Sequence, residues 1–256
     1  MEVSPLLAND TEGSIEAARR IHDQADCPNL LVKIPGTPAG IPAIEESIFA
    51  GVPINVTLLF SPEQYLAAAD AYLRGIERRI EAGLDPKICS VASLFVSRWD
   101  VAVADQLPGE LRNTLGIAVA GQTYRAYREL PESPRCRAII EAGGLPQRLL
   151  WASTSTKDPD APETLYVEAL AAPDTINTLP DATLLAFADH GEVGQPMDPS
   201  AQQADAMLDK LRAAGVDTTE LAERLQEEGV EKFDQAWRKL MAGIDAKRRQ
   251  LGGAPA

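Results

Sequence analysis

The sequence predicts an α/β protein built on a parallel sheet and followed by an all-helical C-terminal region. Up to about residue 180, short apolar runs alternate with helical patterns at the spacing of βαβ units. From about residue 198, amphipathic patterns replace the strands. We expect helices there over 199–214, 217–228 and 229–251, broken at Gly215 and Gly229.

The predicted strands are runs rich in apolar and β-branched residues, which favour extended backbone. They lie at 29–35, 53–60, 89–96, 147–152 and 174–178. Helices are expected before and between them, at 11–24, 42–50, 62–82, 99–106, 114–130, 135–142 and 162–171. Asp10 with Thr11 and Ser61 suit helix N-caps, Pro62 suits a first helical position, and Gly51 suits a C-cap.

Composition and charge limit the classes of partner. The chain has 256 residues, 45% hydrophobic and 24% charged, with a formal net charge of -14. Such an acidic surface repels phosphate backbones and anionic lipid. Residues 1–5 lack the basic and apolar parts of a signal peptide, and no uncharged run approaches the roughly 18 residues of a membrane span. We therefore expect a cytoplasmic protein that binds neither nucleic acid nor membrane.

The cysteines and histidines form no recognisable metal motif. Cys27, Cys89 and Cys136 make no C-x-x-C pair, and the histidines are His22 and His190. Zinc and iron–sulfur sites require closer and more numerous ligands. We expect reduced thiols and no metal.

Lys33 stands inside an apolar strand, flanked by Val32 and Ile34. A lysine is rarely buried without a partner or a purpose. Burial disfavours the charged ammonium form, and a neutral amine can form a Schiff base with a ketone. The alternative is a strand-end lysine whose amine reaches solvent.

Two polar residues follow on the next predicted strand. Asn55 and Thr57 are two positions apart, so their side chains share a face. If Lys33 lies on the neighbouring strand, Asn55 could hold a substrate hydroxyl and Thr57 could position a water for proton transfer. The alternative is a pair of polar core groups that bond each other or the backbone.

Two later strand ends carry groups suited to phosphate. Ser93 ends a strand and Arg98 follows it, and guanidinium binds phosphate in a bidentate manner. Ser153 and Lys157, after the 147–152 strand, could extend the same site. The alternatives are a surface arginine and an ordinary polar loop.

Together these segments resemble the transaldolase family, in its longer actinobacterial and cyanobacterial form. The resemblance runs from Glu2 to about Met241 and rests on the order and spacing of seven segments. They are 2–5, 31–37, 54–61, 90–98, 151–157, 174–180 and 189–191.

The resemblance implies a fold and a set of roles. The fold is a (β/α)8 TIM barrel of the class I aldolase type with a C-terminal helical extension, and active residues of such barrels gather at the C-terminal strand ends. The family's Schiff-base lysine falls on Lys33, and its proton-relay glutamate falls on Glu2. The remaining matches are Asn55 and Thr57 as catalytic residues, Ser93 and Arg98 on the substrate phosphate, Phe95 lining the pocket, and Ser153 and Lys157 as weaker matches.

The implied reaction transfers a dihydroxyacetone unit from a ketose phosphate, sedoheptulose 7-phosphate or fructose 6-phosphate, to an aldose phosphate, glyceraldehyde 3-phosphate or erythrose 4-phosphate. This is a step of the pentose phosphate pathway and needs no cofactor. Sugar phosphates are therefore the expected partners, and a homodimer stays open.

The matched chain supplies fewer strands than the family's barrel. Glu2 normally ends the third strand, so we expect the first two to three strands to be missing and the family's acid–base aspartate to have no counterpart. We expect a partial barrel over 1–197, helices packing on it over 198–251, and a disordered tail over 252–256. The alternatives are a catalytically impaired fragment and a fructose-6-phosphate aldolase-like enzyme.

Overall fold

A five-stranded parallel sheet organises the computed structural model, which describes residues 1–251. The tail expected at 252–256 lies outside the described residues. The strands follow in the order β1-β2-β3-β4-β5, so each pairs with the next along the chain. Their bounds are β1 Val32–Pro35, β2 Ile54–Leu59, β3 Ser90–Phe95, β4 Arg148–Ala152 and β5 Ile176–Asn177. The predicted α/β class with a parallel sheet and C-terminal helices is confirmed.

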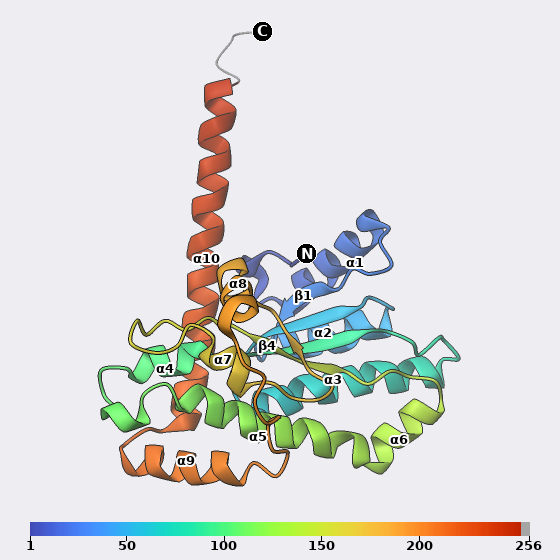
Figure 1. Cartoon of the computed structure of the whole chain (residues 1–256). Helices are drawn as coiled ribbons and strands as arrows, with labels where there is room; N and C mark the ends of the chain where they lie inside the picture. The colour runs from blue at the N-terminus through green and yellow to red at the C-terminus, as the bar shows by residue number, and fades with distance from the viewer. Residues whose placement is uncertain (252–256) are drawn as a thin grey trace.

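Helices connect the strands and cover one face of the sheet (Figure 1). Two of the predicted starts are confirmed in detail. The side chain of Asp10 accepts a hydrogen bond from Gly13 N at 3.0 Å, and that of Ser61 accepts one from Gln64 N at 3.2 Å. The helices before the C-terminal region are α1 Thr11–Ala25, α2 Gly40–Phe49, α3 Pro62–Glu81, α4 Ser97–Val103, α5 Leu115–Glu129, α6 Pro134–Glu141, α7 Leu165–Ala169 and α8 Asp181–His190. Short 3-10 helices are η1 Pro5–Leu7, η2 Gly109–Leu111 and η3 Leu130–Glu132.

The alternation of strand side chains separates the core from the site. Ile34, Val56 and Leu94 point into the main hydrophobic core, where they pack with side chains of the helices. Because side chains alternate along a strand, the neighbouring positions occupy the other face. That face carries Lys33, Asn55, Thr57, Ser93 and Phe95. The sequence thus places apolar residues toward the helices and polar ones toward the concave side.

The C-terminal region forms two helices, α9 Gln202–Ala213 and α10 Thr218–Leu251. The predicted break at Gly215 is confirmed, since this residue has a φ of +92° between them. The predicted break at Gly229 is wrong, because α10 runs through it without interruption. A Cβ at Gly229 would stand 2.9 Å from Leu58 Cδ2, so the glycine serves close packing against β2.

Helix α10 begins on the body of the protein and then extends away from it (Figure 1). Its first turns contact η1, β2 and α4. Leu240, Met241 and Ile244 are exposed on its second half. Across the described residues, no helix combines the length and apolar character needed to span a membrane.

Candidate functional site

Lys33 lies on β1, and the N-terminal residues pair alongside it. Lys33 N donates to Met1 O at 2.8 Å and Val3 N donates to Lys33 O at 3.1 Å, which makes Glu2 a bridge partner of Lys33. The backbone therefore brings Glu2 and Lys33 to the same level of the sheet. Lys33 is half-buried and Glu2 is exposed.

Asn55 is the register partner of Lys33 on the neighbouring strand β2. Its side-chain oxygen accepts a hydrogen bond of 2.7 Å from Ser93 Oγ on β3. Three adjacent strands thus contribute one polar side chain each to the concave face. The bond also fixes the orientation of the Asn55 amide, because the atom that accepts from Ser93 must be its oxygen and not its nitrogen.

Thr57 lies two positions further along β2, beside Pro35. Its side chain is 6% exposed, and among the described residues its Oγ1 has no hydrogen-bond partner. Leaving a buried hydroxyl unsatisfied costs about 1–3 kcal/mol. Such a group calls for an explanation, and a water or substrate oxygen at this site would supply its missing partner.

Arg98 enters the same region from the first turn of α4. Its guanidinium carbon lies 4.8 Å from the ring centroid of Phe95, which is itself buried. Burial lowers the pKa of Arg98 from its ordinary value, and the charge of Glu228 opposes that shift. Nη1 of Arg98 is buried with no partner among the described residues. This unsatisfied N–H group can donate a hydrogen bond to an anionic oxygen without giving up an existing bond.

Helix α10 covers the site from the open side of the sheet. Gln226 Nε2 donates to Gly36 O at 3.0 Å and to Leu58 O at 2.9 Å, which ties α10 to the ends of β1 and β2. Two turns later, Phe233 lies over Lys33. The sequence pattern did not identify Gln226 or Phe233. An amphipathic pattern predicts which side of a helix is buried, but it does not predict which part of the protein that side contacts.

The pocket around Lys33 is small, at about 30 Å³. It lies between the strand ends and α10, and its lining includes Glu2, Lys33, Thr57 and Phe233. The complete lining is Glu2, Val3, Pro5, Ala8, Lys33, Pro35, Thr57, Leu58, Val230 and Phe233. A site for a reactive amine is therefore present, but its volume is small.

The two weaker candidates differ in their placement. Ser153 has a left-handed backbone conformation, with a φ of +56°. Its Oγ lies 2.9 Å from the Oγ of Ser97, the residue that precedes Arg98. Lys157 is exposed and its Nζ donates to Ser155 Oγ at 2.7 Å. It lines a separate pocket with Asp100 and Arg112. The structure thus brings Ser153 to the region of Arg98 and leaves Lys157 outside the Lys33 pocket.

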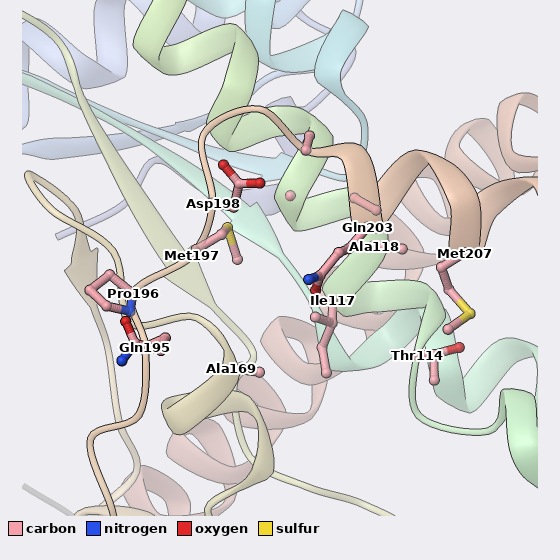
Figure 2. A pocket seen from close by; sticks show the side chains of 13 residues that line it. Thr114, Ile117, Ala118, Ala169, Gln195, Pro196, Met197, Asp198, Gln203 and Met207 are labelled. Carbon is pink, nitrogen blue, oxygen red and sulfur yellow. The ribbon is translucent and has the colours of Figure 1, made fainter.

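A larger pocket, about 480 Å³, lies elsewhere, between α5, α9 and the segment 195–201. In Figure 2, Ile117 of α5 lies between Met197 on one side and Met207 with Thr114, the residue before α5, on the other. It shares no lining residue with the Lys33 pocket. Its mainly apolar walls bring no reactive groups together, so size alone does not mark the candidate site.

A buried carboxylate supports the start of α5, close to the sheet. Asp100 accepts hydrogen bonds from Leu115 N at 2.9 Å, Gly116 N at 3.1 Å and Tyr166 Oη at 2.8 Å. Burial raises the pKa of Asp100, and these three donors oppose the shift. The arrangement caps a helix N-terminus and connects α4, α5 and α7.

Fold and site together define an α/β protein with a lysine amine and a set of polar groups on the concave face of a parallel sheet. Comparison with known protein families identifies the family to which this α/β protein belongs. The chain belongs to the Transaldolase/Fructose-6-phosphate aldolase family, whose model matches residues 1–244.

Relatives support the same assignment over nearly the whole chain. A transaldolase of Parafrankia sp. is 44% identical over 263 residues, which cover 99% of this chain and 70% of that protein. A transaldolase of Neisseria meningitidis serogroup A is 43% identical over 245 residues, covering 95% and 70%. One of Thermobifida fusca is 45% identical over 250 residues, covering 94% and 68%. The five-stranded sheet is consistent with part of the barrel that the resemblance predicts.

Proposed function

We propose that this chain carries the Schiff-base site of a transaldolase, with Lys33 as the nucleophile. Family membership and the relatives named transaldolase support the activity. The observation that carries the site assignment is the pairing of Lys33 with Glu2 on one side and Asn55 on the other. Lys33 is also the only lysine in the described strands.

The proposed reaction begins with the neutral amine of Lys33, which attacks the C2 ketone of a ketose phosphate. Loss of water gives an iminium, which accepts the electron pair when the C3–C4 bond breaks. The aldose product leaves, and a three-carbon enamine stays on Lys33 until an acceptor aldehyde arrives. A new C–C bond and hydrolysis of the iminium then release the product ketose and the free amine.

The other residues have supporting roles in this proposal. Asn55 holds a substrate hydroxyl, while Thr57 and Glu2 position the water that moves protons. The unsatisfied Nη1 of Arg98 suits a phosphate oxygen, with Ser153 as a further hydroxyl partner. Ser93 can donate to the phosphate only by giving up its hydrogen bond to Asn55, because its hydroxyl has one proton. Lys157 lies outside the pocket, so its assignment to phosphate requires a movement of the 153–157 segment.

The finer assignments belong to the same proposal. They are the pentose phosphate pathway, a cytoplasmic location, sugar phosphates as ligands and a homodimer. The acidic net charge of -14 makes a local cation necessary for any phosphorylated ligand, and Arg98 supplies one at this face.

The test is to trap the intermediate. The purified chain is incubated with fructose 6-phosphate, reduced with borohydride and weighed by intact mass, with Lys33→Ala as the control. A dihydroxyacetone-sized adduct that is lost in Lys33→Ala is the expected result. An adduct as large as the whole sugar would show Schiff-base formation with stalled cleavage. The absence of any adduct on a folded chain would overturn the assignment of Lys33.

A further inference from the structure

The ring of Phe233 lies close to both cations of the candidate site. Its centroid is 6.0 Å from Lys33 Nζ and 5.8 Å from Arg98 Cζ. A ketose phosphate joined to Lys33 through its ketone carbon, with its phosphate at Arg98, would place its carbon chain across the same interval. With its centroid within 6.0 Å of both ends of that interval, the ring borders the space that the chain would use.

The small volume of the Lys33 pocket also indicates that a sugar chain would be crowded there. The Lys33 pocket measures about 30 Å³, whereas small-molecule sites commonly measure about 300–1,000 Å³. Phe233 and Val230 close it from α10, while Thr57 and Leu58 line it from β2. A ketose phosphate therefore needs one of these walls to move.

The wall on α10 is the one that can move. The strand residues are part of a hydrogen-bonded parallel sheet, and Gln226 anchors α10 before the ring. After Phe233, most side chains of α10 are exposed, and few tertiary contacts hold this part in place. A change in the Phe233 rotamer, or a shift of α10 beyond Gly229, opens the pocket and leaves the anchor intact.

We propose that Phe233 is a specificity-determining residue of the Lys33 site, whose ring controls which carbonyl compounds reach the amine. The ring holds the place of the sugar carbon chain, and a ketose phosphate binds by displacing it. The inference rests on the proposed roles of Lys33 and Arg98, and it adds a residue from α10 that the family motifs of the strands do not include.

The test measures access to Lys33 without requiring turnover. Wild type and Phe233→Ala are treated with cyanate, a small amine reagent, and with trinitrobenzenesulfonate, a bulky one, and modification of each lysine is followed by peptide mass spectrometry. We expect Phe233→Ala to raise the rate at Lys33 several-fold with the bulky reagent and less with cyanate. Exposed Lys87 should be unchanged with both. Phe233→Leu should fall between the two proteins.

Met241→Ala is the matched control, because it truncates an exposed side chain on the same helix beyond the site. It should label as wild type does. Equal labelling of Lys33 in wild type, Phe233→Leu and Phe233→Ala, all folded by thermal melting, would overturn the proposal. Borohydride trapping with fructose 6-phosphate runs in parallel. Faster bulky labelling in Phe233→Ala without a trapped sugar would support Phe233 as the access residue and reject Lys33 as the Schiff-base lysine.

Discussion

Ser93 on β3 and Asn55 on β2 are joined by a hydrogen bond of 2.7 Å that crosses two neighbouring strands. The bond uses the Asn55 oxygen, on the face of the sheet that also carries Lys33, the register partner of Asn55. Two residues that the sequence assigns to different parts of a substrate are thus coupled in the structure.

Ser93→Ala should slow the trapping of fructose 6-phosphate at Lys33, because the Asn55 amide loses its fixed orientation. A net hydrogen bond contributes about 0.5–1.5 kcal/mol, so we expect a loss of roughly 2- to 10-fold in the trapping rate. Ser90→Ala is the control on the same strand, because Ser90 lies on the opposite face, where its Oγ donates to Ile54 O and accepts from Gln147 Nε2. Equal losses in both variants would show that only the strand is disturbed.

Thr57→Val should separate stability from reactivity. Valine keeps the shape of threonine and removes a buried hydroxyl that has no partner among the described residues. The free energy of unfolding should stay equal or rise by about 1 kcal/mol, while borohydride trapping slows because the proton-relay water loses its partner. Urea unfolding and intact mass measure the two effects. A clear loss of stability would mean that the hydroxyl has a structural partner.

Arg98→Lys should reduce binding of phosphorylated sugars selectively. Lysine keeps the charge but not the forked donors, and hydrogen bonds to charged groups contribute about 1.5–3 kcal/mol. The concentration of fructose 6-phosphate that gives half-maximal trapping should rise by roughly 10- to 100-fold. Trapping of dihydroxyacetone, which has no phosphate, should change little. A parallel loss with both compounds would remove Arg98 from the phosphate site.

Asp100→Asn should change how stability depends on pH. Burial raises the pKa of Asp100 in the folded state above its unfolded value of about 3.9. Its contribution to stability is therefore fully present below the unfolded pKa and is lost as the pH rises through the folded pKa. Asparagine supplies one acceptor where Asp100 accepts three hydrogen bonds, so we expect a loss of about 1–3 kcal/mol at acid pH.

The loss of unfolding free energy in Asp100→Asn should then become smaller as the pH rises from the unfolded to the folded pKa of Asp100. Urea unfolding at several pH values measures this change. Asp105→Asn is the control, because this exposed carboxylate lies on the same stretch of chain. It should stay within about 0.5 kcal/mol of wild type at each pH. A difference between wild type and Asp100→Asn that does not vary with pH would contradict the raised pKa.

The strands were predictable because local pattern decides them. Each predicted run contains the observed strand, and the alternation of Lys33, Asn55 and Thr57 with apolar neighbours fixes which face carries the site. Helix α8 was not predicted as a helix, and its face toward the protein buries only Thr183. The path of α10 was not predictable either, since the Gln226–Gly36 contact joins residues 190 positions apart. Propensity suggests a break at Gly229, but packing against Leu58 outweighs it.

The uneven support along α10 has a consequence for how the chain opens in solution. Its early turns are fixed by Gln226 and Gly229, while later residues such as Leu240 and Ile244 stand in solvent. A helix held at one end loses its free turns first, one after another, without unfolding the sheet. Amide hydrogens should therefore exchange progressively faster from Gln226 toward Ile244, and proteases should shorten the helix from that end before they reach the strands that carry Lys33.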